Sequence, residues 1–401
     1  MTSPSVHSLT TPQIKNWHRS NISIFILLGM GFTAMATRMP LVKADLGVTA
    51  SQLGLILLAT GLGSLGGLNL VGWLISRWGT RRWILWMCPV FTLDVFLGAI
   101  FVENHFTLGY VFTSVLSGFV MGMVDVANNV DGTALEKATN RILMPRMHAG
   151  YSIGTLIAAG WGALSSAIHL SLTLMLLPIV LAQLALPFVV HRYLPHDAGV
   201  EAKHSKTNTH SNKPTEHWFS FVLVLLGIGI LCMTVSEGAA TDWLTLGIKS
   251  GYSVTEATAG VSFMLFFGGM VLVRLYGGHL ADRIGKGRAL QLLAAVGVLG
   301  LVMNVLGAPN LIFSWIGSVL WGAGVALGFP LFLSAAGEGE NAAKRVSFVA
   351  TWGYGSLLCG PPLLGFVADA LGLLNMFYVI AGFLALALLV AGAAGKRPNA
   401  N

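Results

Sequence analysis

The stretch Gly278–Arg288, which reads G-H-L-A-D-R-I-G-K-G-R, is a basic turn punctuated by glycine between two long apolar runs. A second copy, Gly72–Arg82 (G-W-L-I-S-R-W-G-T-R-R), begins 206 positions earlier, and the same offset relates Gly54 to Gly260 one predicted helix upstream. A chain of 401 residues that repeats itself at about half its length indicates an internal duplication. We therefore expect two halves of similar structure.

The composition indicates a membrane protein. Only 10% of the residues are charged, 55% are hydrophobic, and the mean hydropathy is +0.74, so there are too few polar side chains to cover a soluble globule of this size. A net charge of +7 could indicate binding to nucleic acid. However, the basic residues form short clusters between apolar runs, which is typical of charge that orients a protein in a bilayer. We expect the lipid bilayer, and no nucleic acid, as a partner.

A spanning helix needs about 20 apolar residues, and the chain holds twelve such runs. They are expected near residues 20–42, 50–76, 82–102, 106–134, 147–170, 171–194, 218–246, 255–282, 288–307, 310–337, 345–370 and 373–394. The sequence therefore predicts an all-α polytopic membrane protein with twelve transmembrane helices in two pseudo-symmetric six-helix bundles.

One long polar stretch, residues 195–217, separates the predicted bundles at 1–194 and 218–401. We interpret it as a cytoplasmic linker. Its histidines could bind a metal, but they show no fixed ligand spacing, so we expect no metal or cofactor. With the N-terminus inside, 19 of the 23 Lys and Arg residues fall in cytoplasmic segments, and the positive-inside rule then places both termini in the cytoplasm.

Two six-helix halves joined by a cytoplasmic loop, with a G-x-L-x-D-R-x-G-x-x-R turn after the second helix of a half, resemble the major facilitator superfamily over essentially the whole chain. More narrowly, the segments Asn129–Gly132, Met147–Thr155, Glu237–Trp243 and Gly360–Gly365 are similar to a bacterial inner-membrane branch of rhizopine-transporter-like and fucose-permease-like proteins. The resemblance implies a secondary transporter of the bacterial inner membrane that works by alternating access and is coupled to protons.

Ionisable residues inside the spans are the candidates for function, because a charge within the bilayer costs at least about 2.5 kcal/mol. They are Arg38, Asp94, Asp125, Asp131, His148, Glu237, Asp242, Arg274 and His279. In the fourth helix, Asp125, Asn128, Asn129 and Gly132 share one face. This face is expected to line the central cavity; the alternative is a buried network that only holds helices together.

Two carboxyl groups are the candidates for proton coupling. Burial away from water favours the neutral form of a carboxyl group, so Asp125 is the first candidate and Glu237 in the seventh helix is the second. Glu237 and Thr241 share a face at i and i+4 and could present an acceptor and a hydroxyl to a substrate. The alternative is a kink at Gly238.

Two further hypotheses concern arginines. The tripeptides A-T-R and A-T-D, which end at Arg38 and Asp242, are related at an offset of 204, so we hypothesise an Arg38–Asp242 ion pair that closes the periplasmic side. The alternative is that each residue marks the outer interface. Arg274 is expected about 12 Å inside the membrane, paired with Asp125 or reaching toward the cytoplasmic surface.

The two copies of the basic turn are not equal, because Ser76 stands where the second copy has Asp282. In the family that the chain resembles, the acid of such a turn faces the cytoplasmic start of a helix in the other half, where the helix dipole favours a carboxylate. The resemblance therefore implies that Asp282, with Arg283, meets the start of the fifth helix near Arg146. The first turn must rely on Arg77 near the eleventh helix. The sequence thus predicts a lopsided cytoplasmic latch.

Aromatic side chains complete the candidates for the substrate cavity, with packing or interfacial anchoring as the alternative for each. They are Tyr151, Trp243, Trp321, Trp352 and Tyr354. No Ser/His/Asp set, metal cluster or phosphate loop is found, so the chain is not expected to be an enzyme. We expect a monomeric proton symporter for a sugar-, polyol- or amino-sugar-like solute; the alternatives are a proton-antiport exporter of drugs or metabolites and a non-transporting sensor.

Overall fold

The computed structural model describes residues 9–140, 143–200, 220–338 and 341–395, and these residues form helices and turns without a strand. Contacts between residues divide the chain into two compact units. Unit 1 consists of residues 1–36, 44–47 and 56–207, and unit 2 of residues 37–43, 48–55 and 208–401. The predicted all-α class is confirmed.

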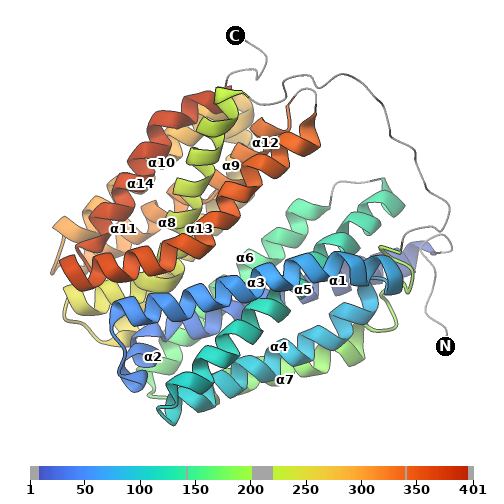
Figure 1. Ribbon diagram of the computed structural model, residues 1–401, viewed down its shortest axis with the longest axis horizontal. Coiled ribbons are helices and arrows are strands. Elements are labelled where there is room, and N and C mark those ends of the chain that lie inside the picture. The colour runs from blue at the N-terminus through green and yellow to red at the C-terminus, as the bar shows by residue number, and fades with distance from the viewer. Residues whose placement is uncertain (1–8, 141–142, 201–219, 339–340, 396–401) are drawn as a thin grey trace. The chain divides into compact units, whose positions relative to one another are not determined.

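Figure 1 shows the helices of both units in blue to red along the chain. The first part of the chain forms α1 (Thr11–Thr37), α2 (Met39–Leu46), α3 (Ala50–Trp78), α4 (Thr80–Glu103), α5 (Thr107–Thr139), α6 (Met144–Ala167) and α7 (Leu172–Val190). The second part forms α8 (Phe221–Gly251), α9 (Glu256–Ile284), α10 (Lys286–Leu306), α11 (Leu311–Val325), α12 (Gly328–Ala336), α13 (Ala342–Leu371), α14 (Met376–Val390) and the 3-10 helix η2 (Ala391–Gly395).

Among the described residues, eleven helices are long and apolar enough to cross a membrane. Helix α6, which has 24 residues and is thus about 36 Å long, accounts for the remaining predicted run. Two boundaries differ clearly from prediction. The first run, expected at 20–42, starts at Thr11 and breaks before α2, and the tenth run divides into α11 and α12.

The division into units does not follow the sequence strictly, because residues 37–43 and 48–55 group with unit 2. Most of the predicted linker, 195–217, lies outside the described residues, so its role stays a prediction. Its first residues are packed in unit 1: Ala198 is buried, and its carbonyl accepts a hydrogen bond from the backbone N–H of Thr80 at 2.9 Å.

The two basic turns have the same backbone in both halves. Gly79 joins α3 to α4 with φ 74°, and Gly285 joins α9 to α10 with φ 84°. Each glycine N–H donates to the carbonyl four residues earlier, to Ile75 at 2.8 Å and to Ala281 at 2.9 Å. A positive φ strains any residue with a Cβ. This explains why the repeat retains glycine here.

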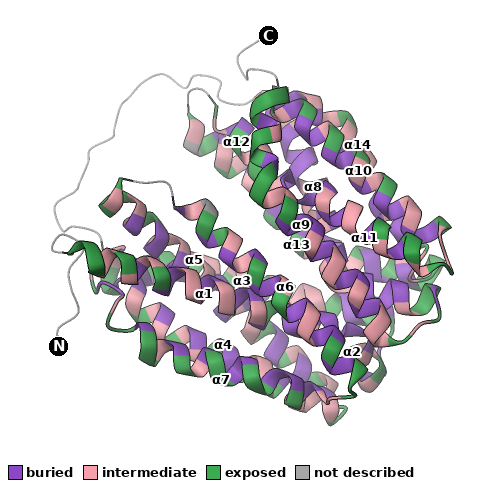
Figure 2. Cartoon of the chain, turned by 180° about the vertical axis from the view of Figure 1, so that it is seen from behind, coloured by how far each residue is buried: buried purple, intermediate pink, exposed green. Residues whose placement is uncertain are grey.

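Exposed residues recur along the helices (Figure 2), and many of them are large and apolar. On α7, for example, Phe188 is 77% exposed and Leu181 is 58% exposed. Such apolar surface is unfavourable in water but suits contact with lipid, where each helix satisfies its own backbone hydrogen bonds. The exposure pattern therefore supports the membrane class that composition predicts.

Candidate functional site

The central feature of unit 2 is an ion pair between two spanning helices. Nη2 of Arg274 on α9 donates to Oε1 of Glu237 on α8 at 2.8 Å, and the two side chains are 28% and 27% exposed. Nε of Arg274 also donates to the carbonyl of Ala326 at 3.2 Å. The guanidinium thus connects α8, α9 and the α11–α12 junction.

The sequence explains why the carbonyl of Ala326 is available. In a continuous helix it would accept from the N–H four residues later, but that residue is Pro330, which has no N–H. The chain turns at Ala326 and Leu327 and resumes as α12 at Gly328. The break in the predicted tenth run therefore supplies an acceptor for Arg274 inside the bundle.

The partner of Arg274 is not the one that the sequence indicated, which was Asp125. The predicted α8 ended at residue 246 and placed Glu237 too near the end of the helix, whereas α8 continues to Gly251. Measured from the α8–α9 turn at 1.5 Å per residue, Glu237 lies about 21 Å along α8 and Arg274 about 27 Å along α9. An arginine side chain reaches across this difference. The hydroxyl of Thr241 donates to the backbone carbonyl of Glu237 at 3.3 Å.

Unit 1 contains a polar chain across α5 and α6. Nδ2 of Asn129 donates to Oδ1 of Asp125 at 3.1 Å and to the Asp125 carbonyl at 2.8 Å. Nε2 of His148 lies 3.1 Å from Oδ1 of Asn129, and the imidazole packs against the ring of Phe25 at 5.1 Å. The amide of Asn129 therefore links a carboxyl group to an imidazole. His148 is a site residue whose role the sequence did not predict, since only its place in a span pointed to it.

The other polar residues of α5 turn toward a buried network. Asn128 was predicted to line the cavity, but it is fully buried, and its Oδ1 accepts from Nδ2 of Asn21 at 3.1 Å. Asp131 accepts from Trp17 Nε1 at 2.7 Å, from Asn21 Nδ2 at 3.0 Å and from Thr80 Oγ1 at 3.0 Å. This network joins α1, α4 and α5, so for Asn128 the structural alternative applies.

Of the aromatic candidates, Trp321 belongs to the core of unit 2 and does not line a cavity. It is fully buried between the rings of Phe266 and Phe377, at 5.4 and 5.3 Å, and its Nε1 donates to Ser236 Oγ at 2.8 Å. An indole with its N–H satisfied is a stable core residue.

Of the other four aromatic candidates, Trp243 lines a cavity between α8 and α13, and the remaining three stay predictions. Trp352 packs beside Phe348 at 6.4 Å. Tyr354 is 43% exposed and lies 6.4 Å from Phe329. Tyr151 packs partly buried against the core of unit 1.

Arg38 forms an ion pair with a different acid from the predicted Asp242. Its Nε lies 3.2 Å from Oε1 of Glu256, and the two side chains are 5% and 12% exposed. Helix α1 ends at Thr37, one residue before Arg38, and Glu256 is the first residue of α9. The turn between α1 and α2 therefore brings Arg38 to the start of α9. Asp242 lines a cavity between α8 and α13 instead.

A second contact also joins a segment of the first half to a helix of the second half, and it involves the start of α3. Oδ1 of Asp369 on α13 accepts from the backbone N–H of Ala50 at 3.0 Å, and Oδ2 accepts from that of Ser51 at 2.8 Å. A carboxylate there satisfies free N–H groups and complements the helix dipole. We call these two contacts, Arg38–Glu256 and Asp369 with the first turn of α3, the outer clasp. All of its residues belong to unit 2.

The residues of the predicted latch lie at exposed positions in their units. Asp282 and Arg283 are exposed on the last turn of α9, and Arg146 is exposed near the start of α6. The guanidinium of Arg77 lies 4.9 Å from the ring centroid of Trp73, as in a cation–π contact. The latch itself stays a prediction.

Long apolar helices grouped into two compact units, with an ion pair between two of these helices inside unit 2, are typical of a membrane transporter. Residues 22–354 match the Major Facilitator Superfamily, and the chain belongs to this family. The predicted superfamily is therefore confirmed, and so is the expectation of a transporter that is not an enzyme.

The comparison with curated proteins finds uncharacterised and rhizobial relatives. An uncharacterised MFS-type transporter of Yersinia pestis is 28% identical over 382 residues, 93% of this chain and 93% of that protein. The membrane protein MosC of Rhizobium meliloti is 26% identical over 357 residues, 87% of this chain and 83% of that protein. The alignments extend over most of each chain, so the relationship includes both halves.

Solved structures share the fold at low identity. The D323A mutant of the nucleoside transporter NupG superposes with a TM-score of 0.76 at 12% identity, with 96% of this chain and 100% of that chain covered. A D-xylose–proton symporter superposes with a TM-score of 0.76 at 11% identity, with 96% and 98% covered. These likenesses establish the major facilitator fold.

Proposed function

We propose that this protein is a proton-coupled symporter that carries a small polar organic solute, such as a sugar, polyol or amino sugar, across the bacterial inner membrane by alternating access. Both termini would lie in the cytoplasm, and one chain would suffice for transport. The observation that carries the proposal is the Glu237–Arg274 ion pair inside unit 2. The fold shared with a D-xylose–proton symporter supports the solute class by analogy only.

The pair provides a simple coupling mechanism. When Glu237 takes up a proton, its carboxyl group loses the charge that attracts Arg274, while Nε of Arg274 still donates to the carbonyl of Ala326. The N–H group that Glu237 releases can then donate to a hydroxyl or ring oxygen of a solute. Departure of the solute restores the ion pair and expels the proton. Proton binding and solute binding therefore favour each other.

The polar chain of unit 1 supplies a second set of groups. Asp125 offers an acceptor, and Asn129 and His148 offer a donor and an acceptor in a fixed geometry. Alternating donors and acceptors suit the hydroxyl groups of a sugar or polyol. We propose that this chain contacts the solute and that Asp125 contributes to proton coupling.

The test is uptake into proteoliposomes that contain a pH-sensitive dye. The probes are radiolabelled D-xylose, L-fucose, myo-inositol, glucosamine and uridine, each tested with and without an inward pH gradient. We expect at least one probe to accumulate only with the gradient and to acidify the lumen as it enters. Alkalinisation of the lumen as a probe enters, or its acidification as a preloaded probe leaves, would indicate the antiporter instead. Gradient-independent flux of every probe would refute proton coupling.

A matched pair of variants links the result to the ion pair. Glu237→Gln should abolish accumulation, because the amide cannot exchange a proton. Glu338→Gln is the control, since Glu338 also pairs with a cation in unit 2, Lys286 at 2.5 Å, but lies after the end of α12. It should accumulate the probe as the wild type does.

A further inference from the structure

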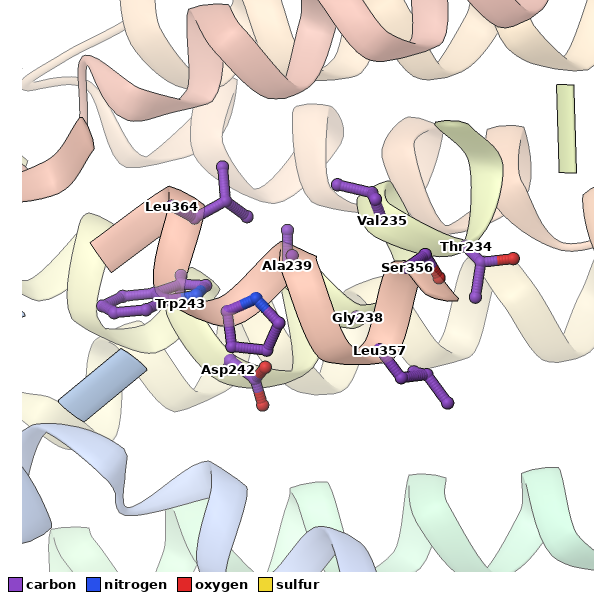
Figure 3. Close-up of a pocket in the computed structure, with 11 residues that line it drawn as sticks. Thr234, Val235, Gly238, Ala239, Asp242, Trp243, Ser356, Leu357 and Leu364 are labelled. Carbon is purple, nitrogen blue, oxygen red and sulfur yellow. The ribbon is translucent and has the colours of Figure 1, made fainter. Parts of the chain in front are cut away.

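A small cavity lies between α8 and α13 in unit 2 (Figure 3). Its polar lining residues are Thr234, Asp242, Trp243 and Ser356. The space open to a water-sized molecule is about 30 Å³, which holds one or two waters but no sugar. Glu237 precedes Asp242 by five residues on α8, a rise of about 7.5 Å.

Two of the lining groups lack a hydrogen-bond partner among the residues that the structure describes. Trp243 is fully buried, and its Nε1 has no acceptor. The Asp242 carboxylate has neither a hydrogen bond nor an ion pair. A buried N–H is costly when unsatisfied, and native structures usually satisfy such a group with ordered water. The half-buried Asp242 carboxylate can accept a hydrogen bond from the same water.

The two hydroxyl groups define what the cavity can bind. Thr234 Oγ1 donates to the carbonyl of Ile230 at 2.7 Å, and Ser356 Oγ donates to that of Gly353 at 2.5 Å. Each hydroxyl therefore offers the cavity only an acceptor. With Trp243 as the one donor in this lining, a ligand must donate more bonds than it accepts. Water or a protonated water fits this requirement.

No cation lines the cavity to balance Asp242. On the helices that pack against α8, Arg274 of α9 is paired with Glu237, and Glu256 of α9 is paired with Arg38. On α13, Asp369 accepts from the start of α3. At the end of α8, Lys249 lies seven residues beyond Asp242, about 10 Å along the helix. Because no cationic side chain lines the cavity, a proton is the cation that neutralises Asp242 most directly.

We propose that Asp242, with Trp243 and water in this cavity, is a second protonation site that delivers the coupling proton to Glu237. Asp242 takes a proton from water and becomes neutral. The proton then passes through water to Glu237, Asp242 returns to its carboxylate form, and the Glu237–Arg274 pair opens. Trp243 holds the water in place through its N–H. The role of the delivered proton rests on the proposed symport, but the protonation of Asp242 does not.

The test is infrared spectroscopy of the full-length protein in lipid nanodiscs over a series of pH values, without any solute. We expect a C=O stretching band of a protonated carboxyl group that grows as the pH falls, is lost in Asp242→Asn and remains in Glu237→Gln. Spectra of Asp242→Asn that match those of the wild type at every pH would overturn the proposal. Because no transport is measured, failure of symport would not affect this result.

Tryptophan variants test the role of water positioning and guard against misfolding. Trp243→Phe keeps an aromatic side chain but removes the indole N–H, so it should shift the pH midpoint of the Asp242 band. Trp315→Phe is the matched control, because Trp315 Nε1 in unit 2 is also buried without a partner but does not line the cavity. It should leave the midpoint unchanged. Equal midpoints in wild type and Trp243→Phe, with equal melting temperatures, would contradict the role of Trp243.

Discussion

Replacing Glu256 by Gln should weaken the outer clasp. In the structure Oε1 of Glu256 lies 3.2 Å from Nε of Arg38, whose side chain is only 5% exposed. Loss of one partner from a buried ion pair costs about 3–5 kcal/mol. Because the amide of Gln keeps a polar oxygen near the guanidinium, we take the lower end, about 3 kcal/mol. A free-energy difference of 1.4 kcal/mol corresponds to about a tenfold change in an equilibrium constant. The equilibrium constant for closing the clasp should therefore fall about 100-fold.

The functional consequence follows from which end of the helices the clasp occupies. With the proposed cytoplasmic termini, the end of α1 and the start of α9 lie on the outer side. Residues 37–43 and 48–55 of the first half group with unit 2. If the clasp keeps the outer side closed, Glu256→Gln should shift the population toward the outward-open state.

The assay is labelling of a single cysteine by a membrane-impermeant maleimide added from outside. The cysteine is introduced as Thr241→Cys after Cys88, Cys232 and Cys359 are replaced by Ser. Glu256→Gln should raise the labelling rate by at least about tenfold. A change of about 100-fold in the closing equilibrium turns the outward-open state from a minor into a substantial fraction of the molecules.

The control for this assay is Glu103→Gln. Glu103 also holds an outer-side helix start, because its Oε1 accepts from the backbone N–H of Thr173 at 2.9 Å, but both residues belong to unit 1. This variant should leave labelling unchanged. If Glu256→Gln and Glu103→Gln label at the same rate, or if the charge swap Arg38→Glu with Glu256→Arg fails to restore slow labelling, the reasoning is refuted.

Three other substitutions test the site and the core. Arg274→Lys keeps the charge but loses the fork that contacts Glu237 and Ala326 together, so solute affinity in uptake assays should fall by about tenfold, a loss near 1.4 kcal/mol; unchanged affinity would contradict this role. Trp321→Phe loses the bond to Ser236 and should lower stability by about 1 kcal/mol in thermal unfolding without changing solute affinity. Asp131→Asn disrupts a network with three donors and should reduce the yield of monodisperse protein in size-exclusion chromatography, with normal yield as the contrary result.

Features that depend on neighbouring residues were predictable from the sequence. The turns at Gly79 and Gly285 were predictable because each depends on a positive φ at one residue, which glycine adopts without strain. The structure shows a positive φ at both positions. The long apolar runs predicted the spanning helices because length and hydropathy decide whether a segment enters a membrane. The resemblance to the superfamily rests on the same local signals.

Pairings between helices were not predictable in the same way. Arg274 pairs with Glu237 because α8 extends to Gly251 and because Pro330 breaks the tenth span, and neither the end of a helix nor its axial offset is fixed by hydropathy. Asn128 and Asn129 are adjacent on one predicted face, yet they bond to α1 and α6 respectively. A helical wheel assigns a face but does not say which neighbour each residue meets.

The central claim is that the Glu237–Arg274 pair couples a proton to solute movement. The most direct measurement compares wild type and Glu237→Gln in proteoliposomes, using the probe that the wild type accumulates under an inward pH gradient. The account predicts that Glu237→Gln loses accumulation but still exchanges labelled for unlabelled probe in counterflow, since exchange requires no net proton movement. Accumulation by Glu237→Gln equal to that of the wild type under the same gradient would contradict it.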